Sequence, residues 1–296
     1  MRPDISIAIP TFGRNAVLVE TVRHLLDLRE RAMELIVVDQ TARHDRETEA
    51  VLEDLQKRGE IRWIRLNEPS ITRAMNRALL EAKSDIVLFL DDDILPEPGL
   101  VSAHAEAHHR TGAVLIAGRV IQPWEEGMAT LASSSFSFSQ TVPAWITEFM
   151  GGNVSIRRNI AIRIGGFDEN FVKVAFRFEA EFAYRARQNG HRIYFEPQAC
   201  IHHLKVGHGG TRTSGDHLTT WRPDHTVGKY YYAMTTKAPI VDFFCLPLQA
   251  IATRHHLRRP WWIPITLVSE VLGFLWARQL IKRARGYVTD MPVEVK

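Results

Sequence analysis

The chain has 296 residues, of which 45% are hydrophobic and 24% are charged, and its formal net charge is +3. This composition is typical of a globular protein with one large domain or slightly more, and it excludes a disordered chain. Two cysteines, Cys200 and Cys245, are too few for a disulfide framework and fit a reducing compartment. The amino terminus runs directly into a strand-like segment, so we expect no signal peptide and a cytoplasmic location.

Positive charge is concentrated towards the carboxyl terminus. Between residues 254 and 285, seven arginines and lysines accompany one acid, Glu270, so the rest of the chain is close to neutral and slightly acidic. A nucleic-acid-binding protein more often spreads such charge across its domain. We therefore expect no nucleic-acid partner.

Strand-like and helix-like patterns alternate through the amino-terminal third of the chain. Strands are predicted at residues 5–9, 34–38, 61–66 and 86–90, and helices with one apolar face are predicted between them, with Asn15 and Ser70 as helix caps. Short connections between alternating strands and helices are typical of a parallel sheet covered on both faces. The sequence therefore predicts an α/β fold.

Three carboxylates directly follow the strand predicted at residues 86–90. That strand is apolar throughout, as expected for burial on both faces, so Asp91, Asp92 and Asp93 must lie where it leaves the sheet. Asp91 and Asp93 are spaced to share one divalent cation that keeps other positions for water or phosphate oxygens. The alternative is an acidic turn that caps the next helix.

Polar residues also follow the other predicted strands. Thr11, Asp39, Asn67 and Asp91 each lie just past the carboxyl end of a strand. In an open α/β sheet these ends share one edge, where ligands bind. We expect the four residues to lie near one ligand site.

An ordered set of motifs resembles the inverting nucleotide-sugar glycosyltransferases of family two, which have the GT-A fold. The motifs occupy residues 7–14, 37–39, 73–76, 90–93, 151–155, 165–169 and 197–203. The resemblance covers roughly the first two-thirds to three-quarters of the chain. It implies a GT-A domain at residues 1–225, with a mostly parallel sheet and helices on both faces, followed by a helical tail at residues 226–296.

By this resemblance, a nucleotide-sugar donor would bind at the ends of the first strands. The pocket would be lined by Pro10, Thr11 and Arg14, and Asp39 would accept a hydrogen bond from the base, unless it is only an acid near a helix start. Arg73 and Asn76 would approach the ribose and diphosphate. The family often has Arg-Asn-x-Gly where this chain has residues 75–78 as Met-Asn-Arg-Ala, so a structural role in the helix is the alternative for both.

The resemblance also implies a divalent metal, manganese or magnesium. Asp93 would be a direct ligand, Asp91 would be shared between metal and ribose, and His203 would complete the site, with His202 as the alternative if the register slips by one residue. Imidazole suits Mn²⁺ better than Mg²⁺. Arg212, in the glycine-rich segment 207–212, would add positive charge over the diphosphate, and a surface loop is the alternative there.

The implied acceptor side comprises a glycine-rich turn and an acidic helix start. Gly151 and Gly152 resemble the loop of the family that approaches the acceptor, although a structural turn would use the same residues. Glu179 would be the catalytic base that takes the proton of the acceptor hydroxyl, and Glu181 falls at a second, often acidic position. The alternative is that both acids simply favour a helix start.

The tail combines apolar runs with flanking arginines. Residues 243–251 and 261–277 are mostly apolar, and Trp261 and Trp262 stand next to cationic residues. The second run is shorter than the about 20 residues that a spanning helix needs. This pattern favours a helix lying in the plane of an anionic membrane leaflet, peripheral at the inner face of the plasma membrane. The alternative is a helix packed on the domain or on a partner subunit.

These features favour a metal-dependent, inverting glycosyltransferase that adds a single sugar to a hydroxyl acceptor, either a glycan or a lipid-linked intermediate of polysaccharide synthesis. The Gln-x-x-Arg-Trp motif of processive synthases is missing. A sugar-phosphate nucleotidyltransferase is disfavoured, because residues 10–14 contain one glycine and no glycine-rich phosphate loop. A non-catalytic sugar-nucleotide-binding or membrane-scaffold protein is disfavoured by the intact Asp91, Asp93 and Glu179.

Overall fold

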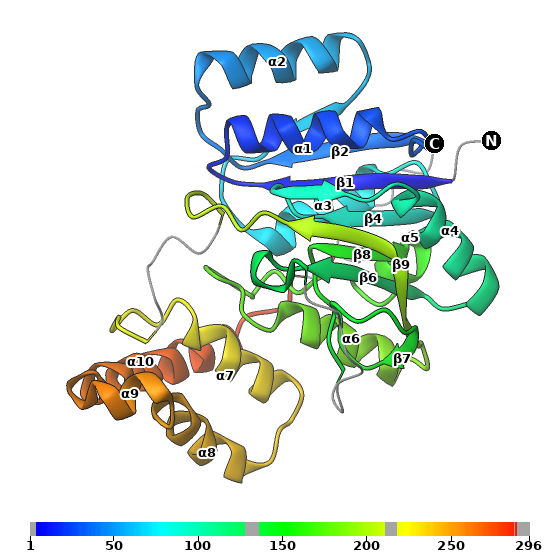
Figure 1. Ribbon diagram of the computed structural model, residues 1–296. Helices are drawn as coiled ribbons and strands as arrows, with labels where there is room; N and C mark the ends of the chain where they lie inside the picture. The colour runs from blue at the N-terminus through cyan, green and yellow to red at the C-terminus, as the bar shows by residue number, and fades with distance from the viewer. Residues whose placement is uncertain (1–3, 128–135, 211–217, 287, 289–296) are drawn as a thin grey trace.

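The computed structural model describes residues 4–127, 136–210, 218–286 and 288. Within them one sheet forms the centre of the molecule, with strand order β3-β2-β1-β4-β8-β6-β9-β5 and with β7 paired to β9 (Figure 1). The strands are β1 (Ile5–Thr11), β2 (Glu34–Asp39), β3 (Arg62–Arg65), β4 (Ile86–Leu90), β5 (Ile94–Pro96), β6 (Leu115–Ile121), β7 (Ala144–Ile146), β8 (Asn153–Arg157) and β9 (Ile193–His203).

The first four strands are parallel, as the alternating pattern predicts. The strand β8 then enters the sheet antiparallel to both β4 and β6, while β6 and β9 are parallel to each other. The short strands β5 and β7 pair antiparallel with β9. The α/β prediction is confirmed, and the sheet is mixed in its second half.

Helices cover both faces of the sheet. They are α1 (Ala16–Asp27), α2 (Arg46–Lys57), α3 (Ile71–Glu81), α4 (Leu100–Thr111), α5 (Arg158–Arg163) and α6 (Phe178–Gln188). Neighbouring residues of a strand point to opposite faces. Accordingly, Leu88 of β4 lies in a core with α1, α2 and α4, whereas Phe89 lies in a larger core with α3, α5 and α6.

The two predicted helix caps have different outcomes. The Ser70 side chain accepts a hydrogen bond from Arg73 N at the start of α3, so that prediction is confirmed. Asn15 precedes α1 but makes no side-chain cap. Its amide oxygen instead lies 3.0 Å from Nδ1 of His44, because the loop after β2 runs beside the start of α1.

The carboxyl-terminal part consists of α7 (Thr226–Thr235), α8 (Ile240–Ile251), α9 (Arg254–Arg258) and α10 (Ile263–Leu280), grouped at one end of the molecule (Figure 1). One face of α10 packs against α7. Thr226 Oγ1 donates a hydrogen bond to Ser269 O at 2.9 Å, and Lys229 pairs with Glu270 at 2.6 Å. These contacts explain why polar residues interrupt an otherwise apolar helix.

The carboxyl-terminal helices also contribute to the larger core. Val227 and Tyr231 of α7 and Ala277 of α10 are buried in it. The boundary between residues 225 and 226 therefore divides two segments that share one core, and a separate domain there stays a prediction.

Both α8 and α10 also expose apolar side chains to solvent. On each helix the exposed apolar residues occupy positions i, i+1, i+4 and i+8, which lie on one helix face. They are Ile240, Val241, Phe244 and Leu248 on α8 and Leu267, Val268, Val271 and Leu275 on α10. In the described part of the chain, one helical segment, Pro260–Leu280, is long and apolar enough to cross a membrane, judged by length and composition alone. This segment is longer at both ends than the apolar run at residues 261–277 of the sequence.

Candidate active site

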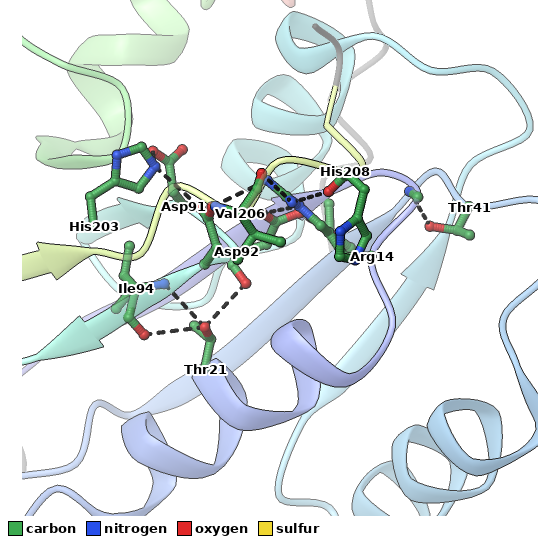
Figure 2. A network of polar contacts seen from close by, with 12 residues as sticks. Arg14, Thr21, Thr41, Asp91, Asp92, Ile94, His203, Val206 and His208 are labelled. Atoms are coloured by element: carbon green, nitrogen blue, oxygen red, sulfur yellow. Dashed lines mark hydrogen bonds and ion pairs between the residues drawn. The ribbon is translucent and has the colours of Figure 1, made fainter. Parts of the chain in front are cut away.

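The site lies at the carboxyl ends of β1 and β4, where three aspartates leave the sheet. Thr11 Oγ1, at the end of β1, donates a hydrogen bond of 2.7 Å to Asp92 Oδ2. The Arg14 guanidinium, just before the start of α1, lies with Nε 3.1 Å from Asp92 Oδ1 (Figure 2). Its Nη2 lies 3.2 Å from Asp93 Oδ2. Thr11 and Arg14 therefore lie together at the predicted edge.

Arg14 also fixes the segment that follows β9. Its Nη1 donates to the carbonyl oxygen of Val206 at 3.1 Å and to that of His208 (Figure 2). The backbone N–H of Val206 donates in turn to Asp93 Oδ2 at 2.9 Å. One guanidinium thus joins the acidic turn after β4 to the chain that leaves β9.

Asp91, Asp93 and His203 form the one cluster of metal-ligating type among the described residues. One ligand atom from each lies within 4.8 Å of the other two. His203 Nε2 lies 3.2 Å from Asp93 Oδ1 and 3.7 Å from Asp91 Oδ2. Two carboxylates and one imidazole are a donor set that fits a divalent cation such as Mn²⁺.

The register places His203, and not His202, beside the aspartates. His202 turns to the other side of β9, where its Nε2 lies 2.7 Å from Glu97 Oε1. The alternation of side chains along a strand separates the two neighbours. The geometry therefore favours His203 over His202, and its role as a ligand stays a prediction.

Electrostatics in the cluster follows from burial and pairing. Burial raises the pKa of Asp92 to about 6, against the opposing effect of Arg14. Burial also works against ionised Asp93, but the hydrogen bond from His203 and the charges of His203 and Arg14 prevail and lower its pKa. The same bond raises the pKa of His203 above its ordinary value, although burial opposes the charged imidazole.

Asp39 ends β2 in a closed polar cluster. The carboxylate accepts hydrogen bonds from Thr41 N at 2.8 Å, His44 Nε2 at 2.6 Å and Trp63 Nε1 at 2.9 Å. The side chain has no exposed surface. Contact with a nucleobase, expected from the resemblance, would therefore require one of these neighbours to move, and that role stays a prediction.

The structure gives Asn76 a structural partner. Its amide donates to Phe167 O at 2.8 Å and accepts from Phe167 N at 2.8 Å, so it holds the turn before α6. Arg73, half exposed, pairs with Glu68 and Glu169. These contacts favour the structural alternative for Asn76, and ligand contact by either residue stays a prediction. Arg212 lies outside the described residues.

The Gly151–Gly152 turn lies between the metal cluster and α6. A Cβ on Gly152 would lie 2.1 Å from Asp91 Oδ2, and a Cβ on Gly151 would lie 3.4 Å from Glu179 Oε1. Asp91 N also donates to Gly152 O at 3.2 Å. The lack of side chains on this turn brings Glu179 to one side of it and Asp91 to the other.

The two acids of α6 have different surroundings. Glu181 is 1% exposed, and both carboxylate oxygens accept hydrogen bonds from Arg185, at 2.7 and 2.8 Å. Arg185 also donates to Ile164 O and Gly166 O. Glu181 is thus part of a structural ion pair, whereas half-buried Glu179 faces the glycine turn.

The sequence analysis assigns no individual role to three residues of the site. Asp92 lies inside the acidic triplet and holds Thr11 and Arg14, His44 pairs with Asp39, and Gln122 contacts His203. The triplet itself marks Asp92. His44 and Gln122 carry no local signal, because strand register and loop path bring them to their partners.

Comparison with known proteins identifies the family. Residues 6–173 match the family described as Glycosyl transferase family 2, which is more than half of the chain. The chain belongs to glycosyl transferase family 2. This membership agrees with the family that the sequence motifs resemble.

Two curated relatives of this glycosyltransferase are distant. The probable glycosyltransferase YdaM of Bacillus subtilis (strain 168) is 25% identical over 219 residues, which are 67% of this chain and 50% of YdaM. The glucosyl-dolichyl phosphate glucuronosyltransferase of Haloferax volcanii is 22% identical over 220 residues, 67% of this chain and 68% of that protein. The chain spans about half the length of YdaM.

Solved structures share the GT-A fold of this glycosyltransferase. The mannosyltransferase PcManGT of Pyrobaculum calidifontis, in complex with GDP-Man and Mn²⁺, has a TM-score of 0.58 and 19% identity, covering 95% of this chain and 79% of its own. GalNAc-T7 with UDP, GalNAc and Mn²⁺ has a TM-score of 0.57 and 14% identity, covering 79% and 51%. TarS of S. aureus with UDP-GlcNAc has a TM-score of 0.57 and 15% identity, covering 79% and 66%.

Proposed function

We propose that this glycosyltransferase transfers one sugar from a nucleoside-diphosphate donor to an acceptor hydroxyl, with inversion, and that Glu179 is the base. The observation that carries the proposal is the Gly151–Gly152 turn, which has Asp91 on one side and Glu179 on the other. Donor and acceptor groups would meet across this turn. Inversion needs this arrangement, because the hydroxyl must attack from the face opposite the leaving diphosphate.

In the proposed reaction, the Glu179 carboxylate takes the proton of the acceptor hydroxyl as its oxygen bonds to the anomeric carbon. The bond between that carbon and the diphosphate oxygen breaks, and the diphosphate leaves with the electron pair. A divalent cation held by Asp91, Asp93 and His203 would stabilise the negative charge that develops there. Arg14 keeps Asp93 and the chain after β9 in place for this charge.

The solved relatives support a nucleotide-sugar donor and a metal. Their structures contain GDP-Man with Mn²⁺, UDP with GalNAc and Mn²⁺, and UDP-GlcNAc. Both uracil and guanine occur among them, so they do not select one base for this chain. The cluster of Asp91, Asp93 and His203 supports manganese, because imidazole is a better ligand for Mn²⁺ than for Mg²⁺.

We further propose that the enzyme acts at the cytoplasmic face of a membrane on a lipid-linked acceptor of polysaccharide synthesis. The exposed apolar residues of α8 and α10 support this, as does the exposed Trp261 beside Arg258 and Arg259. Aromatic and cationic side chains favour the membrane interface. The Haloferax relative is named for a glucosyl-dolichyl phosphate, which supports a lipid-linked acceptor.

The test measures binding and slow hydrolysis of a panel of nucleotide sugars, with Mn²⁺, with Mg²⁺ and with chelator. It compares the wild type, Glu179→Gln, and Glu106→Gln, a matched change of an exposed glutamate on α4. We expect one donor to bind only with metal, and Glu179→Gln to lower turnover about 10²- to 10⁴-fold with binding retained. Failure of every nucleotide sugar to bind with any metal would contradict the proposal.

A further inference from the structure

Gln122 contacts the ring nitrogen of His203 that does not face the aspartates. His203 Nδ1 lies 3.1 Å from Gln122 Oε1. An amide oxygen only accepts hydrogen bonds, so Nδ1 carries the hydrogen. The other ring nitrogen, Nε2, then faces Asp93 and Asp91 at 3.2 and 3.7 Å. A single contact thus selects which nitrogen is presented to the acidic cluster.

Strand register brings Gln122 to this position. In the parallel pair of β6 and β9, Gly118 lies opposite Glu196, but the next residue, Arg119, lies opposite Cys200. Residues 197–199 are therefore a bulge of β9. After the bulge Ile121 lies opposite His202, which puts Gln122 beside His203. Without the bulge, pairing would continue residue by residue from Gly118 and Glu196, and Gln122 would lie beside Cys200. His203 would then lie beyond the end of β6.

The bulge is held by buried groups that the proposed reaction does not use. The Asn153 amide donates to Arg119 O at 3.0 Å and to Ala199 O at 2.9 Å, on the two sides of the irregularity. A Cβ on Gly118 would lie 2.2 Å from Asn153 Nδ2, so only glycine leaves room for that amide. His104 Nε2 lies 2.9 Å from Asn153 Oδ1 and fixes the amide from behind.

The backbone of Gln122 is fixed as well. Its N–H donates to Glu125 Oε2 at 3.0 Å, and Ser139 Oγ donates to Glu125 Oε1 at 2.8 Å. Gln122 thus begins a short turn, Pro123–Glu125, that is tied to a later part of the chain. A side chain on such a support loses little freedom when it holds another residue.

We propose that Gln122 is a positioning residue of the metal site, and that the bulge at residues 197–199 exists to set the register of His203 against it. The inference rests on the proposed metal cluster and extends it by one partner. Groups that orient a metal-ligating histidine through its second nitrogen typically contribute 10- to 100-fold to metal affinity. Gln122 would act through its contact with the His203 ring.

The experiment measures Mn²⁺ affinity of the full chain by titration with electron paramagnetic resonance, so it needs neither donor nor acceptor. The variants are Gln122→Leu, which removes the acceptor oxygen, and Gln122→Glu, which keeps one. Gln140→Leu is the matched control, because Gln140 lies in the same part of the chain and its amide binds the carbonyl of Val142. His203→Ala gives the affinity without the ligand, and circular dichroism monitors folding.

We expect Gln122→Leu to weaken Mn²⁺ binding about 10- to 100-fold, Gln122→Glu to restore it, and Gln140→Leu to leave it unchanged. If His203→Ala weakens binding and Gln122→Leu does not, the inference is overturned while the metal site stands. If neither variant changes Mn²⁺ binding, or the wild type binds none, the proposed metal site fails and the inference fails with it.

Discussion

His44 Nε2 lies 2.6 Å from Asp39 Oδ2 just past the end of β2, and neither side chain is exposed. His44 Nδ1 lies 3.0 Å from Asn15 Oδ1. Both partners are oxygens that accept, so both ring nitrogens donate and the imidazole carries a positive charge below its raised pKa. Asp39 and His44 are therefore a buried ion pair at the edge where the donor is proposed to bind.

This pair predicts a specific dependence of stability on pH. The hydrogen bond to Asp39 and the charges of Asp39 and Glu49 raise the pKa of His44 above 6.5, although burial and Arg65 oppose the charged form. The contribution of the His44–Asp39 pair to the free energy of unfolding is complete below pH 6.5. It is lost as the pH rises through the raised pKa of His44. We expect His44→Gln to lower the free energy of unfolding by about 3 kcal/mol at pH 6, and by less in alkaline solution.

Urea denaturation of the wild type and His44→Gln across a pH series measures this difference. A change at His24, an exposed histidine on α1, serves as the control and should leave the pH dependence unaltered. A difference between wild type and His44→Gln that stayed constant with pH would show that His44 is uncharged in the folded protein.

The Gly151–Gly152 turn predicts a variant that damages the site and spares the fold. The methyl group of Gly152→Ala would lie 2.1 Å from Asp91 Oδ2, so the half-exposed Asp91 side chain must move away. We expect at least a tenfold loss of Mn²⁺ affinity and of transfer, with little change in unfolding. Gly207→Ala, which meets nothing within 4 Å, is the control. Full metal affinity in Gly152→Ala would mean that Asp91 is not a ligand.

The parts of the site that the sequence predicts are those that follow from local pattern. Apolar runs that end in Asp39 or Asp91 place those acids at one edge of the sheet, because parallel strands end together. The contacts that it misses depend on register and on loop paths. Asn15 binds His44 instead of capping α1, and Gln122 meets His203 only because a bulge shifts β9 against β6.

Glu181 predicts a variant that affects stability more than chemistry. Its carboxylate holds Arg185, which also binds two backbone carbonyls before α6. Loss of one partner of a buried pair costs roughly 3 kcal/mol, so Glu181→Gln should lower the free energy of unfolding by about that amount. At a temperature where it is folded it should turn over donor faster than Glu179→Gln. A stable but inactive Glu181→Gln would move the base role to Glu181.

The buried histidines behind the bulge predict sensitivity to acid. Burial lowers the pKa of His104 to about 4 and that of His108 to about 3, so both are neutral in the folded protein at pH 5. The unfolded chain takes up protons below about 6.5, and stability therefore falls as the pH falls. For His104 the loss approaches about 3 kcal/mol by pH 4. We expect the free energy of unfolding of His104→Gln to fall less steeply than that of the wild type between pH 6.5 and pH 4. An equal fall in both proteins would contradict a neutral, buried His104.

The exposed apolar stripes of α8 and α10 predict binding to anionic vesicles. Phe244 is 70% and Leu248 62% exposed on α8, and burying such side chains in a bilayer interface is favourable by about 1.5–3 kcal/mol each. The double change Phe244→Asp and Leu248→Asp should therefore lower co-sedimentation with vesicles of phosphatidylcholine and phosphatidylglycerol at least tenfold. Vesicles of phosphatidylcholine alone should bind the wild type more weakly, because exposed arginines such as Arg258 gain about 1 kcal/mol each near anionic lipid. Val142→Asp, a change at a residue that is 61% exposed elsewhere on the surface, is the control.

Equal binding by the double variant and the wild type would exclude α8 as a membrane-binding surface. Sedimentation velocity would then test whether α8 instead pairs with a second copy of the chain.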